Sequence, residues 1–195
     1  MKNRIFEKFI ELSFEDSVNN VSLSKLAKSL GMSKPNLYTY FDSKDALIFE
    51  MIDSRMAGKL EILKSVLEEK KSPTERLKKV IDKIIENYVE DTKYWVVFNQ
   101  VIMTMILKSE KKLENLKKRK ASVKGIFTEL LKQGKESGEF REDLDENKTA
   151  MLVFGMLSPV LKRNMCDLEE GIDHKEISNM IISILFNGIK NRRTV

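Results

Sequence analysis

The sequence of 195 residues predicts an all-α fold. The chain contains only three prolines and eight glycines, so few positions interrupt a helix. Apolar residues recur at three- and four-residue spacing along nearly the whole chain, and no alternating run of apolar and polar residues indicates a strand. Hydrophobic residues make up 42% of the chain, which is enough to build a buried core.

Apolar spacing and one capping residue define the first two helices. The spacing predicts a helix over about residues 3–14, and the polar stretch "EDSVNN" ends it. Ser22 is a suitable N-cap for a second helix, because its hydroxyl can accept a hydrogen bond from a first-turn N–H. Gly31 ends that helix and supplies the positive φ that a tight turn needs.

A short third helix and a long fourth helix follow. Ser33 is the expected cap of the third helix, and Pro35 lies in its first turn, where a missing N–H costs nothing. The fourth helix is expected to start near Asp42 or Ser43 and to extend to about Lys70.

Five further helices account for the rest of the chain. Ser72, Pro73 and Glu75 predict a capping box at the start of the fifth helix, which carries a regular apolar stripe. Pro159 predicts a bend inside the eighth helix, and Asp173 with Glu176 predicts a second capping box at the ninth. The helices after the fifth are expected over about residues 93–108, 110–137, 146–164 and 173–190.

The segment from Ser22 to Lys44 has the pattern of a helix-turn-helix motif. Its two short amphipathic helices are joined by the tight turn "LGMS", and in this motif the second helix lies in the DNA major groove. The segment holds four lysines and one acidic residue, which gives +4 − 1 = +3, whereas residues 1–50 hold seven basic and seven acidic residues. Positive charge is therefore concentrated on this segment.

The second of these helices carries residue types that suit DNA recognition. Asn36 can bond an adenine edge, Lys34 can reach guanine, and Thr39 can offer a methyl group or a hydroxyl. Tyrosine hydroxyls and an ammonium group can bind phosphate oxygens, while Leu37 and Phe41 are expected in the core. Helical hairpins of this kind also occur in proteins that do not bind DNA. The predicted DNA contacts are Ser22, Ser33, Lys34, Pro35, Asn36, Tyr38, Thr39, Tyr40 and Lys44.

The stretch "VSLSKLAKSLGMSKPNLYTYFDSKDAL" resembles the signature of TetR/AcrR-type bacterial transcriptional regulators. The resemblance covers residues 4–50, and "LLKQGKESGEFREDLDENKTA" is similar to the usual passage between helices seven and eight of that family. Two departures stand out: Ser17 and Val18 replace a Gly-aromatic pair, and Pro35 stands where glycine is commoner.

The resemblance implies a nine-helix fold with a DNA-binding domain at residues 1–46 and an effector-binding and dimerisation domain at residues 47–195. It also implies a repressor that leaves a palindromic double-stranded DNA operator when a small molecule binds. The boundary falls inside the fourth helix, with no Gly- or Pro-rich linker, so the two parts share a rigid helix.

The last two helices predict a homodimer. Each carries two apolar faces, and one helix needs two partners to cover both: its own core and a second protomer. Which face of the ninth helix meets the partner stays open at this point. The candidate dimer contacts are Phe154, Leu157, Ile181, Leu185 and Phe186.

The sixth helix is apolar almost all round, which indicates burial on most sides or an apolar effector pocket lined by aromatic and Met side chains. The pocket is expected among helices four to seven. The effector is expected to be largely hydrophobic, with polar groups that meet Tyr88, Asn99 or Gln100. The candidate ligand contacts are Tyr88, Trp95, Phe98, Asn99, Ile102, Met105 and Phe127.

Several function classes are excluded by the residues present. Cys166 and His174 are the only cysteine and histidine, so no Cys/His metal site, catalytic pair or internal disulfide is expected. No nucleotide loop, G-x-S-x-G or H-E-x-x-H motif occurs, which predicts no enzyme and no cofactor. The longest uncharged stretch, residues 94–107, is too short for a membrane span of about 20 residues, and a cytoplasmic protein is expected.

Three functional hypotheses follow from the sequence. The leading one is a ligand-responsive repressor. The second is a DNA-binding protein of the same fold that answers to a protein partner or has no effector. The third is a helical interaction module whose helix-turn-helix is only structural. DNA affinity separates the third hypothesis from the others, and release of DNA by a ligand separates the first from the second.

Overall fold

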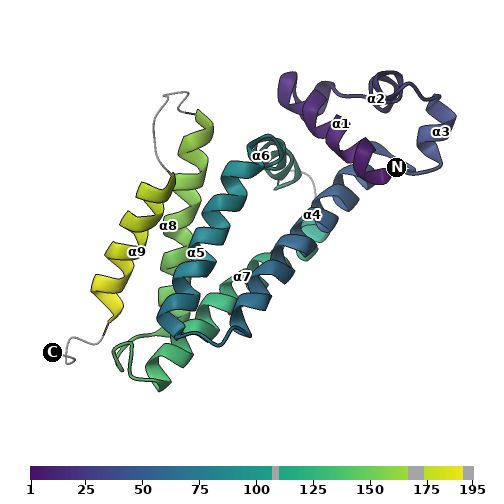
Figure 1. Cartoon of the computed structure of the whole chain (residues 1–195). Helices are drawn as coiled ribbons and strands as arrows, with labels where there is room; N and C mark the ends of the chain where they lie inside the picture. Colours follow the sequence, from purple (N-terminus) through teal and green to yellow (C-terminus); the bar gives the residue numbers. More distant parts are fainter. Residues whose placement is uncertain (107–109, 167–173, 191–195) are drawn as a thin grey trace. The chain divides into compact units, whose positions relative to one another are not determined.

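The computed structural model describes residues 1–106, 110–166 and 174–190, and it confirms the all-α prediction (Figure 1). Within these ranges the only strand-like pairing is an isolated antiparallel bridge between Phe140 and Lys190. The helices are α1 (Lys2–Glu15), η1 (Val18–Asn20, a 3-10 helix), α2 (Leu23–Leu30), α3 (Lys34–Tyr38), α4 (Lys44–Leu67), α5 (Pro73–Glu90), α6 (Thr92–Ile106), α7 (Glu110–Glu136), α8 (Glu146–Cys166) and α9 (His174–Ile189).

The local signals in the N-terminal part form as predicted. The Ser22 hydroxyl accepts a hydrogen bond from Lys25 N at 3.1 Å, and the Ser33 hydroxyl accepts one from Asn36 N at 3.3 Å. Gly31 adopts φ +68°, the left-handed conformation that ends α2. These three residues therefore set the ends of α2 and the start of α3.

The start of α5 and the end of α4 are fixed by side chains on α5. The predicted capping box is confirmed, because Ser72 N donates to Glu75 at 3.0 Å and Glu75 N donates to the Ser72 hydroxyl at 3.2 Å. Helix α4 ends at Leu67, three residues before the predicted Lys70. The buried Arg76 guanidinium donates to Leu67 O at 2.6 Å and so binds a carbonyl that a longer helix would use internally.

Two predictions near the C-terminus are not tested by the described residues. Helix α8 continues to Cys166 through Pro159, and the bend expected at that proline stays a prediction. Asp173, half of the second predicted capping box, lies outside the described residues.

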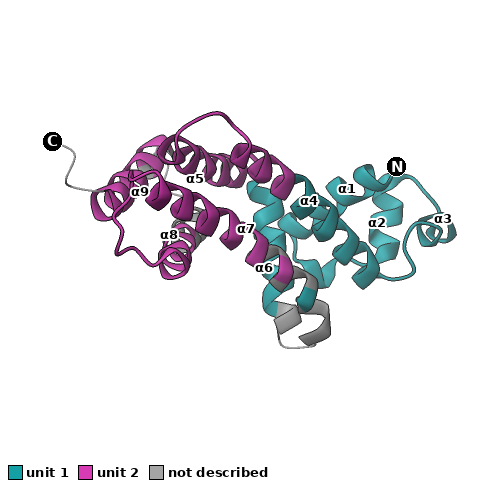
Figure 2. Ribbon diagram, turned by 90° about the horizontal axis from the view of Figure 1, so that it is seen from below, with its two compact units in different colours: residues 1–58, 91–116 teal, residues 59–90, 117–195 magenta. Residues whose placement is uncertain are grey.

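The chain divides into two compact units, which are shown in different colours in Figure 2. Unit 1 contains residues 1–58 and 91–116, and unit 2 contains residues 59–90 and 117–195. The first unit therefore includes α6 as well as the predicted helix-turn-helix. The functional boundary predicted between residues 46 and 47 stays a prediction.

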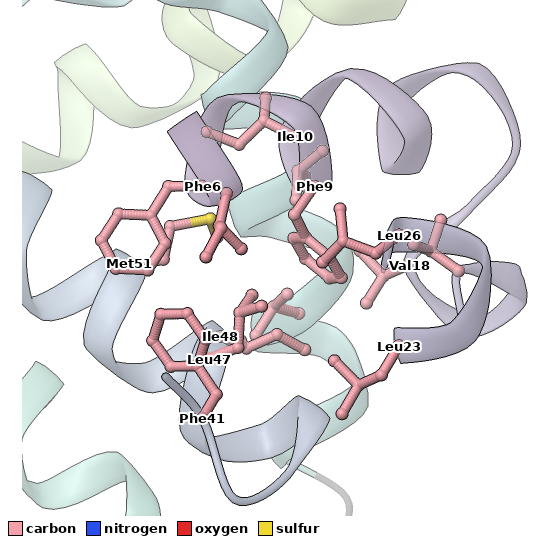
Figure 3. Packing of buried hydrophobic residues seen from close by; sticks show 14 of the residues in the cluster. Phe6, Phe9, Ile10, Val18, Leu23, Leu26, Phe41, Leu47, Ile48 and Met51 are labelled. Atoms are coloured by element: carbon pink, nitrogen blue, oxygen red, sulfur yellow. The ribbon is translucent and has the colours of Figure 1, made fainter. Parts of the chain in front are cut away.

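The core of unit 1 joins α1, η1, α2, the first half of α4 and α6. Figure 3 shows side chains of α1, such as Phe9, pointing toward Leu26 of α2 and Leu47 of α4. Helix α6 packs against α1 and η1 through one face, whose members recur at three- and four-residue spacing. The buried residues of that face are Tyr94, Val97, Phe98 and Val101.

An ionic contact fixes the start of α6 within unit 1. The Arg55 guanidinium of α4 pairs with Asp91 at 2.5 Å and also with Glu7 of α1. The guanidinium carbon Cζ of Arg55 lies 5.3 Å from the centre of the Tyr94 ring. Helix α6 is therefore held to both α1 and α4 at its N-terminal end.

Unit 2 has its own core, in which α5 packs against α8 and α9. Phe127 and Phe140 are fully buried there. Gly134 of α7 allows a close approach, because a Cβ at this position would lie 2.1 Å from the Phe140 ring. Arg141 N donates to Ile189 O at 3.0 Å and ties the α7–α8 turn to the end of α9.

Candidate nucleic-acid interface

Helix α3 presents most of the predicted DNA contacts to solvent. Leu37 is fully buried and holds the helix against the core of unit 1, as the sequence predicts. The other side of this short helix is accessible and polar. Its exposed predicted contacts are Ser33, Lys34, Pro35, Asn36, Tyr38 and Thr39.

Short-range contacts order this face. The Thr39 hydroxyl donates to Asn36 O at 2.7 Å, so its proton is bound within the helix. The Lys34 ammonium lies 5.8 Å from the centre of the Tyr38 ring, within cation–π range. The exposed Asn36 side chain has the donor and acceptor pair that an adenine edge requires.

At the start of α2, the exposed Ser22 is the N-cap, next to backbone N–H groups that can bind a phosphate. Lys25 is less available, because its ammonium pairs with Asp16 at 2.8 Å. The hydrogen bond from Lys25, with a second from Asn20, lowers the pKa of the Asp16 carboxyl below its usual value. Part of the positive charge counted in the sequence is therefore neutralised inside unit 1.

The last two predicted DNA contacts are only half exposed. Tyr40 packs against the core of unit 1. The Lys44 ammonium donates to Val18 O and, at 3.3 Å, to Asn19 O. Its predicted role in phosphate binding stays a prediction, but two backbone carbonyls already bind this group.

A contact that the sequence does not reveal holds the turn between α1 and α2. Val18 N donates to the Gln100 side-chain oxygen of α6 at 2.9 Å, across 82 positions of sequence. Ser17, just before, has φ 156° and ψ 148°, a combination that favours glycine. The sequence marks Ser17 and Val18 as unusual for the family it resembles, but no local pattern points to Gln100.

The predicted ligand contacts are divided between unit 1 and unit 2. Phe98 is buried in the core of unit 1, where its ring centre lies 5.2 Å from that of the half-buried Trp95. Ile102 is also half-buried there, and the half-buried Asn99 donates to Trp95 O at 2.7 Å.

Two further predicted ligand contacts belong to unit 2. Phe127 is fully buried in the core of unit 2, and Tyr88 is buried in α5. The side chain of Met105 lies outside the described set. Gln100, expected to meet a polar group of the effector, accepts the bond from Val18 N through its side-chain oxygen, and a contact with an effector stays a prediction.

The predicted dimer contacts lie mostly inside unit 2. Four of them, Leu157, Ile181, Leu185 and Phe186, are buried in its core, and Phe154 is half-buried. Among the described side chains of α8 and α9, the apolar ones that are more than half exposed are different: Met151, Leu152, Met180 and Ile184.

The described residues contain no group of three or more His, Cys, Asp or Glu side chains that could hold a metal ion. In the same part of the chain, no helix is both long and apolar enough to cross a membrane.

Two protein families match separate parts of this chain. Residues 10–51 match the family described as bacterial regulatory proteins, tetR family. Residues 70–162 match the family described as tetracyclin repressor-like, C-terminal domain. The first match contains α2 and α3, and the second contains α5, α6 and α7.

A relative that spans nearly the whole chain is the fatty acid metabolism regulator protein of Bacillus subtilis (strain 168). It is 25% identical over 192 residues, which are 97% of this chain and 95% of that protein.

Solved structures share the fold. The regulator FadR from Bacillus subtilis, in complex with stearoyl-CoA, has a TM-score of 0.80 at 21% identity, over 97% of this chain and 100% of that chain. A regulator from Saccharomonospora viridis, in complex with choline, has a TM-score of 0.84 at 18% identity, over 98% of each chain.

Proposed function

Because this chain belongs to the TetR family of bacterial transcriptional regulators, which are not enzymes, we propose that it is a ligand-responsive repressor. It binds a palindromic operator in the cytoplasm as a homodimer, and a small-molecule ligand with a long apolar chain releases it. The observation that carries the proposal is α3, which exposes DNA-compatible side chains on one side and buries Leu37 on the other.

Base recognition is assigned to Lys34, Asn36 and Thr39, and phosphate binding to Ser22 and Tyr38. Asn36 and Lys34 read base edges, and the Thr39 methyl group is free to contact thymine while its hydroxyl binds Asn36 O. Ser22 and Tyr38 bind phosphates and set the position of α2 and α3 on the duplex.

The homodimer uses the exposed apolar residues of α8 and α9. Met151, Leu152, Met180 and Ile184 leave apolar surface uncovered in unit 2, and an isologous contact between two copies would bury it. This choice replaces the residues expected from the sequence, because most of those are already packed in the core of unit 2.

The effector is assigned to the long-chain acyl-CoA class. The support is the relative named as a fatty acid metabolism regulator and the FadR structure solved with stearoyl-CoA. On this chain the flank of α6 formed by Trp95, Asn99 and Ile102 is half-buried, so these side chains are better placed for ligand contact than the fully packed Phe127.

The alternative is a DNA-binding protein of the same fold that is controlled by a protein partner or has no effector. It differs from the leading proposal in one observable, because no acyl-CoA would change its affinity for DNA.

The test begins with selection of binding sites from a random pool of DNA duplexes. The expected product is an inverted repeat whose half-sites lie about 34 Å apart, or a multiple of that, bound by two protomers. Asn36→Ala should cost about 1–3 kcal/mol at one base position and relax specificity there. Recovery of no preferred sequence would contradict DNA recognition.

The second part of the test adds ligands to the selected complex. Stearoyl-CoA should lower the affinity for the selected duplex about 5- to 150-fold, as expected for a coupling of about 1–3 kcal/mol. Choline serves as the comparison ligand, and release by choline alone would reject the acyl-CoA class. No response to either ligand would favour the alternative.

The dimer is tested separately. Ile184→Lys should give a folded monomer with weak operator binding, because a charge would be buried at the proposed interface. Lys175→Ile provides a comparison on an exposed polar position of the same helix and should leave the dimer intact. A parent protein that sediments as a monomer at micromolar concentration would contradict the proposal.

A further inference from the structure

We call residues 2–38, from α1 to α3, the DNA-reading unit. The turn between α1 and α2 is the one part of these residues whose backbone is unfavourable for its own sequence. Ser17 has φ 156° and ψ 148°, which is a region that side chains other than glycine rarely occupy. A residue in such a conformation persists only when its surroundings hold it.

Two side chains from outside α1 and α2 bind the residue that follows Ser17. Gln100 of α6 accepts the hydrogen bond from Val18 N at 2.9 Å, and Lys44 at the start of α4 donates to Val18 O. The Val18 side chain is itself buried in the core of unit 1. Both backbone groups of Val18 are thus bound by distant residues.

The α1–α2 turn comes directly before Ser22, the first of the proposed DNA contacts. Ser22 follows η1 by two residues and caps α2, and α2 packs against α3. A change in the position of Val18 would therefore shift the N-terminus of α2 and, with it, the helix that reads the bases.

We propose that Gln100 is a positioning residue for DNA binding: through the Val18 amide, α6 holds α2 and α3 in the conformation that fits the operator. This inference rests on the proposed function. Lys44 binds the other backbone group of Val18, its carbonyl, so its main role is to hold the turn and not to bind phosphate.

The position of Gln100 on α6 extends the inference to regulation. Successive residues of a helix are 100° apart, so Gln100 lies on one flank of the buried face and Trp95, Asn99 and Ile102 lie on the other. A ligand that rotates or shifts α6 from the second flank would displace the Gln100 oxygen from Val18. The bond is thus a route by which effector binding lowers DNA affinity.

Two substitutions of Gln100 test this role. Gln100→Met removes the acceptor and keeps the length of the side chain, whereas Gln100→Glu keeps an acceptor for the Val18 amide. Gln100→Met should lower the affinity for the selected duplex about 5- to 150-fold, because it leaves a part-buried N–H without this acceptor. Gln100→Glu should bind within about threefold of the parent.

Binding to a random duplex separates positioning from simple removal of a DNA contact. Non-specific binding depends on phosphate charge, and Gln100 is neutral, so Gln100→Met should leave it within about threefold of the parent. Adding Ser17→Gly to Gln100→Met should recover part of the specific affinity, since the turn would then need less support.

Failure of the Gln100 inference and failure of the proposed function give different results. If the parent selects a duplex and Gln100→Met binds it as tightly as the parent does, the inference about Gln100 is wrong while the proposed function stands. The same conclusion follows if Gln100→Glu is as weak as Gln100→Met in a protein that is folded by circular dichroism. If the parent selects no duplex, the proposed function fails, and the role of Gln100 in DNA binding fails with it.

Discussion

Two turns of the DNA-reading unit are built in different ways. The α2–α3 turn is local: Gly31 adopts φ +68°, Met32 N donates to Ala27 O at 3.0 Å, and Ser33 caps the next helix. The α1–α2 turn is held from a distance, because Val18 is bound by Gln100 and Lys44. A turn of the first kind is closed by hydrogen bonds among neighbouring residues, whereas a turn of the second kind is hydrogen-bonded to another helix and can be moved by it.

The largest expected effect comes from disturbing the local turn. Gly31→Ala should lower the free energy of unfolding by about 1–2 kcal/mol, because φ +68° brings an added Cβ too close to the backbone. No other atom lies within 4 Å of that Cβ, so the cost is purely conformational. Urea denaturation of the two proteins measures it, and a variant as stable as the parent would show that the turn is not confined to this conformation.

At the α1–α2 turn, glycine should raise the free energy of unfolding relative to alanine by relieving the backbone. Ser17→Gly should be about 1 kcal/mol more stable than Ser17→Ala, because only glycine adopts this backbone conformation without strain. The Ala variant is the matched control, since both substitutions remove the hydroxyl that accepts the bond from Asn19 N at 3.3 Å. Equal stability of the two variants would show that the backbone at Ser17 is not strained.

A smaller effect distinguishes the two roles considered for Lys44. If its ammonium holds η1, Lys44→Met should weaken operator binding without changing the slope of log affinity against log salt. If it binds phosphate, the slope should fall by about one unit for each phosphate that the variant no longer neutralises. Titrations at several salt concentrations measure the slope. A smaller slope for Lys44→Met would show that Lys44 contacts phosphate.

The smallest effect concerns the ion pair beside the α1–α2 turn. The hydrogen bonds from Lys25 and Asn20 lower the pKa of Asp16 in the folded protein, so they stabilise the fold above the unfolded pKa of about 3.9. This contribution is lost as the pH falls through the lower folded pKa. Asp16→Ala should therefore destabilise the protein at neutral pH, and its difference from the parent should shrink as the solution is made strongly acidic. A constant difference would mean that protonation of Asp16 does not matter.

The sequence predicts most of the fold because most of its signals are local. Ser22, Ser33 and Ser72 cap helices as expected, and Gly31 ends α2, because each residue contacts neighbours within a few positions. Leu37 could be assigned to the core from its spacing alone. The exposed face of α3 follows from the same pattern.

Other parts of the candidate sites depend on contacts between distant segments. The faces of α9 could not be ranked from apolar spacing, because Ile184 and Ile181 are equally apolar and only packing against α5 separates them. Gln100 was expected to face an effector because nothing near it in sequence indicates Val18 as its partner. Lys44 was assigned to phosphate because a lysine at a helix start gives no sign of which acceptor it binds.

Helix α6 holds the α1–α2 turn through Gln100 and, among the described residues, has no hydrogen bond to Met32 N in the α2–α3 turn, which bonds Ala27 O. Amide hydrogen exchange measured by NMR in the parent and in Gln100→Met tests it most directly, because Val18 N and Met32 N report on the two turns. The substitution should speed exchange at Val18 about 5- to 150-fold and leave exchange at Met32 unchanged. Unchanged exchange at Val18, or an equal increase at both amides, would contradict it.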